Sequence, residues 1–357
     1  MQKLNRDIGS SFYTLHDDDQ ELIALSQNKI NFNLNFSYYY SGRNAILAIL
    51  KKITKSQVIG TIWLPEYYCD TVVNMVCSNF DSVKYYLINP FKFDEDIDIY
   101  KFSKRGDIVL LNNFWGLSSF SYQRSHAEQP IIIEDHSHGW QSKQSLQSHA
   151  DYCICALRKT YPIPLGAVVW KPNSVENIDF YESLDDNAII NALKKFSTSM
   201  DLKRNFIKKN DEDVKEKYLM AFNEGEDLLN VSNNFIMPSS EFVKSVEKYI
   251  YLSPNTIKQK HLNYISKHLK KSQNFKIISR KGFTPFGLLL LFKDVRTFKS
   301  FKTFLISNQI YPAHLWPYSK LDTQWKYLFN IHIDFRYDIE DMSYLVEKIN
   351  VWIKNNV

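Results

Sequence analysis

Apolar and polar residues alternate in blocks along the first half of the chain, between about residues 42 and 170. Residues 43–54 place Ile and Leu at the spacing of one helical face, which predicts an amphipathic helix. Short apolar runs then follow, separated by connecting segments, as expected of strands that alternate with helices. The strand-like runs are VIGTIWL (58–64), VKYYLI (83–88), DIVLL (107–111), PIII (130–133), YCICAL (152–157) and AVVW (167–170).

Several of these runs are apolar throughout and show no alternation with polar residues. Strands that are buried on both faces, as in a mostly parallel sheet covered by helices, have this pattern. The first part of the chain therefore predicts an α/β domain built on a mostly parallel sheet.

Beyond Pro172 the pattern changes to long, charged, helical stretches. The expected elements are helices at about 177–197, 201–233, 239–270, 295–307 and 339–354, and strands at 274–279 and 286–292. This order predicts a smaller α+β domain at the C-terminus. The predicted division is an N-terminal arm at 1–30, a large domain at 31–245 and a small domain at 246–357.

Composition and charge exclude some partners. The 357 residues carry a formal net charge of +5, from 44 basic and 39 acidic residues. So small a charge argues against nucleic acid and against an anionic membrane surface as partners, and no apolar run is long enough to span a bilayer. Cys153 and Cys155 would share one face of a strand and pack as small apolar residues. With no disulfide framework and a polar N-terminus, the sequence predicts a cytoplasmic protein.

Chemically active side chains follow several of the predicted strands. Asp135, His136 and His138 come directly after one strand, and Lys159 comes after the next. Ligands of open α/β sheets bind beyond the carboxyl ends of the strands, so these residues are expected to meet at one edge. Two further groups belong there: the aromatic pair Tyr67 and Tyr68, and the helix start Ser41-Gly42-Arg43-Asn44.

An enzyme that uses pyridoxal 5'-phosphate needs this set of groups. The cofactor requires a lysine that holds it covalently and a carboxylate that keeps its pyridine nitrogen protonated. Its phosphate requires free backbone N–H groups, such as those at a helix N-terminus. The sequence therefore predicts a pyridoxal-phosphate site with Lys159 and Asp135 as its reacting pair.

The chain resembles the fold-type I pyridoxal-phosphate enzymes, and among them the DegT/DnrJ/EryC1/StrS family of sugar aminotransferases. The stretches that carry the resemblance are SGRNAILAIL (41–50), LPEYYCDTVV (64–73), IIIEDHSHGW (131–140) and LRKTYPIPLGAVVW (157–170). They stand in the order found in the family, and the resemblance extends over roughly residues 30–235. It implies the aspartate-aminotransferase fold, a mostly parallel large domain, and a homodimer with shared active sites.

The resemblance also implies roles for single residues. Asp135 would contact the pyridine nitrogen, His138 would meet the ring hydroxyl, and Tyr68 would stack on the ring, with Tyr67 or Cys69 as alternatives one residue away. Gly42 and Arg43 would offer backbone N–H groups to the phosphate. Two positions depart from the family: a phosphate-binding serine is Ala156 here, and the usual Gly-Gly reads Gly166-Ala167.

Four functions stay open from the sequence. The leading hypothesis is an aminotransferase that takes an amino donor, such as glutamate, and a keto acceptor, by resemblance a nucleotide-linked keto-sugar. The second is another pyridoxal-phosphate reaction such as a lyase, and the third is a relative of the fold without turnover, which Ala156 keeps open. The fourth is a metal-dependent hydrolase that uses Asp135, His136 and His138. It is suggested by the four histidines that fall within 24 residues: His126, His136, His138 and His149. Trp316 lies in a family-like segment, YPAHLWP, and is interpreted as a packing residue.

Overall fold

The computed structural model describes residues 6–93, 97–122, 129–172, 174, 176, 178–182, 186–232, 234–316 and 321–356. A seven-stranded sheet dominates the first half of the chain, in the order β1-β7-β6-β5-β4-β2-β3. Its strands are β1 (Ser37–Tyr39), β2 (Ile62–Pro65), β3 (Val83–Tyr86), β4 (Ile108–Asn112), β5 (Ile131–Asp135), β6 (Tyr152–Cys155) and β7 (Ala167–Trp170). Strands β3, β2, β4, β5 and β6, which are neighbours in that order, pair in parallel. Strand β7 pairs antiparallel with both of its neighbours, β6 and β1. The predicted α/β class with a mostly parallel sheet is therefore confirmed.

Helices cover one face of this sheet. The helix α2 (Gly42–Ser56) begins where the Ser41 side chain accepts a hydrogen bond from the backbone N–H of Asn44, a capping contact that satisfies a free amide of the first turn. Its apolar side packs with α3 (Asp70–Asn79) on the sheet face that includes Ile133 and Ile154. This face supplies one of the two large cores of the domain.

The opposite face of the sheet packs against the N-terminal segment and later helices. Ile132 and Cys153, the neighbours of Ile133 and Ile154 in the strands, belong to this second core. Successive side chains of a strand point to opposite faces of the sheet. Cys153 and Cys155 are both fully buried here, so their predicted packing as small apolar residues is confirmed. Helices of this region are α1 (Gln20–Ser26), α5 (Asn187–Lys209), α6 (Glu212–Val231), α7 (Ser240–Ile250) and the short α4 (Lys143–Leu146).

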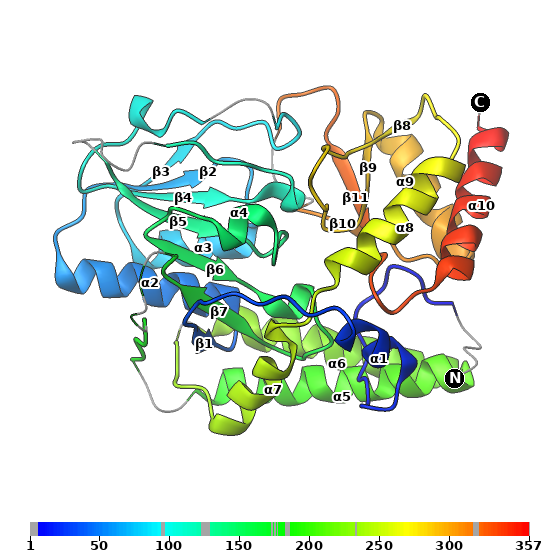
Figure 1. Ribbon diagram of the computed structural model, residues 1–357, viewed down its shortest axis with the longest axis horizontal. Helices are drawn as coiled ribbons and strands as arrows, with labels where there is room; N and C mark the ends of the chain where they lie inside the picture. Colours follow the sequence, from blue (N-terminus) through cyan, green and yellow to red (C-terminus); the bar gives the residue numbers. More distant parts are fainter. Residues whose placement is uncertain are drawn as a thin grey trace.

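A second, four-stranded antiparallel sheet forms near the C-terminus, in the order β10-β11-β9-β8. Figure 1 shows this sheet beside the large sheet, with α10 at the outer edge of the molecule. In this view α8 is drawn between the smaller sheet and α10. Its elements are α8 (Asn255–His268), β8 (Phe275–Ile277), β9 (Leu288–Phe292), α9 (Val295–Ser307), β10 (Ala313–His314), β11 (Tyr327–Ile331) and α10 (Ile339–Asn355). Strand β11, with four of its five residues buried, was missing from the sequence prediction.

The helix boundaries after Pro172 needed correction. The sequence predicted a break near residue 200, whereas the chain breaks after Lys209, where Asn210 takes a left-handed φ of 52° and Asp211 caps the next helix. Asparagine tolerates this conformation better than most residues. The predicted single helix at 239–270 is two helices, because Pro254 stands between α7 and α8 and proline cannot continue a helix.

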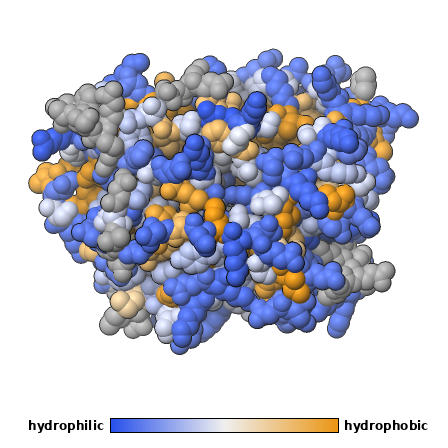
Figure 2. Space-filling model, viewed as in Figure 1, coloured by the Kyte–Doolittle hydropathy of each residue, from blue (hydrophilic) through white to orange (hydrophobic). Residues whose placement is uncertain are grey.

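The surface is mainly polar. Figure 2 shows one face of the molecule covered largely by hydrophilic residues, with apolar residues scattered among them. Among the described residues, no helix is long and apolar enough to cross a membrane.

Candidate active site

A cavity of about 570 Å³ opens beyond the carboxyl ends of the parallel strands; we call it the strand-edge cavity. Its volume lies in the usual range for sites that bind small molecules. Five of the six site residues predicted from the sequence line it: Gly42, Arg43, Asp135, His138 and Lys159. Residues almost 120 positions apart in the chain therefore meet in one place.

Asp135 is the last residue of β5 and is almost completely buried. One carboxylate oxygen accepts a hydrogen bond from the Tyr68 hydroxyl at 2.6 Å, and the other accepts one from the Ser137 backbone N–H at 2.8 Å. The Ser137 hydroxyl in turn accepts from the Ala156 backbone N–H at 3.0 Å. These two hydrogen bonds, one to each oxygen, fix the orientation of the carboxylate at the strand end.

Lys159 ends the short 3₁₀ helix Leu157–Lys159 that follows β6. Its Nζ lies 3.4 Å from Nε2 of His138. Burial, and then the positive charge of Lys159, hold the pKa of His138 well below its usual value. His138 is therefore a neutral imidazole beside the lysine.

Aromatic rings surround His138. The ring of Trp115 stacks on it with centroids 5.4 Å apart, and Trp316 stacks on it at 5.3 Å. Nδ1 of His138 is buried and has no hydrogen-bond partner among the described residues. A buried polar atom without a partner is unfavourable, so this nitrogen is a candidate contact for a ligand.

The N-terminus of α2 lies at the side of the cavity next to the loop after β6. A Cβ atom at Gly42 would lie only 3.1 Å from Cβ of Ala156, so the two segments approach very closely. The Arg43 side chain donates to Asn230 on α6, and Arg158 pairs with Glu226 one turn earlier. Burial, and then the charge of Arg158, lower the pKa of Arg43, which shows two guanidinium groups close together at this end.

The structure places Tyr68 differently from the other predicted site residues. Its side chain is buried, is absent from the cavity lining and directs its hydroxyl at Asp135. Cys69, the neighbouring alternative, does line the cavity.

Several cavity-lining residues were not predicted as site residues. Trp316 lines the cavity as well as packing, and its family-like segment was the signal available in the sequence. Arg158 also lines the cavity, and its signal was its place beside Lys159 after a strand. The others come from distant parts of the chain and had no local signal: Ser10, Ser11, Phe12, Glu226 and His332.

The histidines after β5 do not point to one place. His136 lies on the other face of the sheet, where its Nε2 contacts Glu134 at 2.8 Å. Among the described residues, the one cluster of potential metal ligands is Glu134, His136 and Cys153, which contains neither Asp135 nor His138. His149 is exposed, and His126 lies outside the described residues. The arrangement therefore does not support the metal site that the spacing of the histidines suggested.

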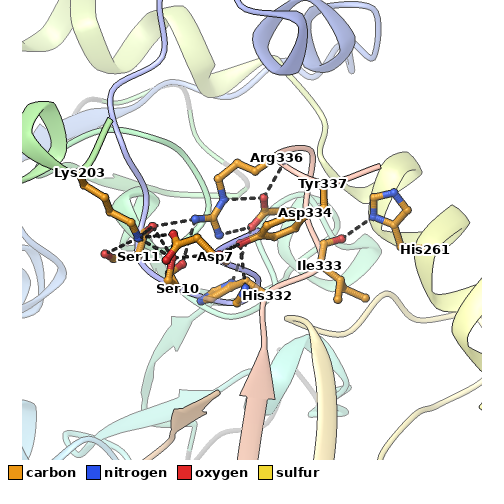
Figure 3. A network of polar contacts seen from close by, with 11 residues as sticks. Asp7, Ser10, Ser11, Lys203, His261, His332, Ile333, Asp334, Arg336 and Tyr337 are labelled. Carbon is orange, nitrogen blue, oxygen red and sulfur yellow. Dashed lines mark hydrogen bonds and ion pairs between the residues drawn. The ribbon is translucent and has the colours of Figure 1, made fainter. Parts of the chain in front are cut away.

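A buried ionic network holds the N-terminal segment against the cavity (Figure 3). Lys203 contacts Asp7 at 3.1 Å, and Arg336 makes two hydrogen bonds of 2.8 Å to Asp334. Arg336 also donates to the backbone carbonyls of Ser10 and Ser11, at 2.9 and 2.8 Å. The network therefore positions the segment that forms one wall of the cavity.

No family model matches the sequence, and no curated protein matches it. Solved structures do match, over nearly the whole chain. Spr1654 from Streptococcus pneumoniae in its PLP form is 10% identical, with 98% of this chain and 94% of that chain covered and a TM-score of 0.58. Sugar aminotransferase CalS13 from Micromonospora echinospora is 12% identical (96% and 98% covered, TM-score 0.53). AtS13 from Actinomadura melliaura is 10% identical (96% and 99% covered, TM-score 0.53).

The chain has the fold of the fold-type I aminotransferases. The predicted fold class is thereby confirmed. The likeness covers almost the full length of both chains.

Proposed function

We propose that this chain is a pyridoxal-phosphate-dependent aminotransferase. The observation that carries the proposal is the convergence of Lys159, Asp135 and His138 on one cavity at the carboxyl edge of a fold-type I sheet. A lysine and a buried carboxylate that line the same cavity are the two groups that this cofactor requires.

The residues present fit the cofactor. Asp135 would pair with the pyridine nitrogen, and the unpartnered Nδ1 of His138 marks a place for the ring hydroxyl. The amides of Gly42 and Arg43 open the first turn of α2, where a phosphate is favoured by free N–H groups and by the helix dipole. The guanidinium groups of Arg43 and Arg158 add positive charge at the end where the family serine is Ala156.

Lys159 has two tasks in this proposal. Its Nζ holds the cofactor, and after release it moves a proton between the substrate carbon and the cofactor carbon. Bound pyridoxal phosphate would supply a ring that takes up the electron pair left on the substrate carbon. Neutral His138 can contact Lys159 without adding a second positive charge.

The substrates follow from the resemblance and from the names of the similar structures. The donor would be an amino acid, with glutamate the first to test, and the acceptor a keto-sugar, in the family a nucleotide-linked one. CalS13, which shares the fold, is a sugar aminotransferase. The identity is too low for the substrate of that protein to be transferred directly.

A single half-reaction tests the proposal without the acceptor. The protein loaded with pyridoxal phosphate is titrated with glutamate, glutamine and a panel of other amino acids. The visible absorbance is followed, and the released cofactor is identified by mass spectrometry. An aminotransferase converts the cofactor to pyridoxamine phosphate and stops, whereas a lyase regenerates the starting form in every cycle. If no donor yields pyridoxamine phosphate, the aminotransferase proposal is wrong.

We also propose a homodimer with shared active sites. This proposal rests on the resemblance and on Ala156. Alanine offers the phosphate no hydroxyl where the family has a serine, and a residue of a second copy could supply the missing contact. Light scattering should give twice the mass of the 42.1 kDa chain. A fully active monomer at nanomolar concentration would exclude shared sites.

A further inference from the structure

Tyr68 makes a contact that its expected role as a stacking ring does not explain. It follows β2, whereas Asp135 ends β5, and β4 lies between these two strands in the sheet. The Tyr68 side chain therefore reaches past one strand to place its hydroxyl 2.6 Å from the carboxylate. Both side chains are buried, at 1% and 6% exposure, so water does not compete strongly for this bond.

The hydroxyl is a permanent donor. Burial, and then the negative charge of Asp135, raise the pKa of the Tyr68 phenol well above its usual value. The phenol therefore keeps its proton over the physiological range and donates a hydrogen bond to the carboxylate. A hydrogen bond to a charged group is stronger than one between neutral groups, and more so in a buried site.

The contact also completes a chain of hydrogen bonds across the strand ends. Tyr68 holds one oxygen of Asp135, Ser137 holds the other, and Ser137 is joined to the backbone of Ala156. Ala156 begins the turn that carries Lys159. The carboxylate thus has a defined orientation relative to the lysine before any ligand binds.

We propose that Tyr68 is a positioning residue that orients Asp135 toward the ring nitrogen of the cofactor. This inference rests on the proposed pyridoxal-phosphate function. In this proposal Tyr68 acts by holding Asp135, and not by stacking on the ring as the resemblance implies. Two fixed hydrogen bonds leave the carboxylate little freedom to rotate, so the ion pair with the nitrogen forms without a further loss of conformational entropy.

The experiment compares two ligands that differ only at the ring nitrogen. One is pyridoxal phosphate, and the other is its 1-deaza analogue, in which a C–H group replaces the nitrogen. Dissociation constants for both are measured by absorbance or calorimetry for the wild type, Tyr68→Phe, Asp135→Asn and the double variant. Tyr39→Phe is the matched control, because Tyr39 is equally buried, is absent from the cavity lining and donates its hydroxyl to the Ile178 carbonyl at 3.1 Å.

We expect Tyr68→Phe to weaken pyridoxal-phosphate binding by about tenfold, the scale of one charged hydrogen bond. Binding of the deaza analogue should change little, because that ligand has no nitrogen for Asp135 to meet. In protein that already carries Asp135→Asn, Tyr68→Phe should not change the ratio of the two dissociation constants any further. Tyr39→Phe should leave both dissociation constants close to those of the wild type.

The other outcomes are separable. If Tyr68→Phe weakens both ligands equally, its role is structural and the inference is wrong; if it weakens neither, the contact has no role in binding. If wild-type protein binds neither ligand, the proposed function itself fails. Melting temperatures of all variants show whether the fold is kept.

Discussion

The two faces of the sheet at the end of β5 carry polar groups of the same kinds but in different states. On one face Glu134 accepts hydrogen bonds from Tyr122 at 2.8 Å and Ser148 at 2.7 Å, and contacts His136 at 2.8 Å. His136 also contacts Asn113 at 3.2 Å through its other ring nitrogen. Every polar atom of the Glu134–His136 pair therefore has a partner inside the protein.

On the other face, the polar groups are only partly satisfied. The Asp135 carboxylate has two donors, but one buried nitrogen of His138 has no partner in the part of the chain that the structure describes, and the contact between Lys159 and His138 is long, at 3.4 Å. A cavity lies over this face, whereas the Glu134–His136 pair is enclosed by side chains. The difference favours the cluster of Asp135, His138 and Lys159 as the one that binds a ligand, and the Glu134–His136 pair as the one that stabilises the fold.

Replacement of Lys159 should give the largest effect. Lys159→Ala removes both the group that holds the cofactor and the base, so we expect a loss of at least about 10³-fold in turnover. Borohydride reduction followed by peptide mass spectrometry should find no cofactor on the variant. The matched control is Lys171→Ala, since Lys171 also follows a buried strand; it should keep wild-type turnover. Cofactor trapped on another lysine would contradict the assignment.

Replacement of Glu134 should affect stability and not binding. Glu134→Gln weakens the contacts that the Glu134 carboxylate makes with Tyr122, Ser148 and His136, and buried polar groups left with poor partners cost about 3 kcal/mol. The loss is measured as the free energy of unfolding in urea, with the pyridoxal-phosphate dissociation constant measured alongside. Glu182→Gln is the control, because its pair with Lys51 is partly exposed and should contribute less than about 1 kcal/mol. Weaker cofactor binding with an unchanged free energy of unfolding would contradict the prediction, because Glu134 would then act in binding and not in stability.

The smallest predicted effect concerns acid stability. Burial alone would raise the pKa of Asp334, but the paired Arg336 outweighs it and lowers that pKa to about 2. In the unfolded chain the carboxyl titrates near pH 4, so the pair contributes about 2 kcal/mol that is complete above roughly pH 4. This contribution is lost as the pH falls toward 2. Unfolding in urea between pH 5 and 2.5 should show a shallower pH dependence for Asp334→Asn than for the wild type, and equal slopes would refute the prediction.

Local sequence signals were sufficient for much of this protein. Helix α9 has the predicted bounds, 295–307, and five of the six residues proposed as the site line one cavity. These features follow from short-range patterns: the period of apolar residues, and polar residues placed directly after a strand. Such patterns act within a few residues, so they can be read without knowing which segments meet.

The tertiary structure decided the features that depend on distant partners. The sequence placed Tyr68 at the site, but only the order of β2, β4 and β5 directs its hydroxyl to Asp135. The different states of His136 and His138 likewise depend on which side chains arrive from elsewhere, Asn113 on one face and Lys159 on the other. A residue's neighbours in sequence determine its conformation, whereas its hydrogen-bond partners and burial, and hence its chemistry, are set by segments whose position no local pattern contains.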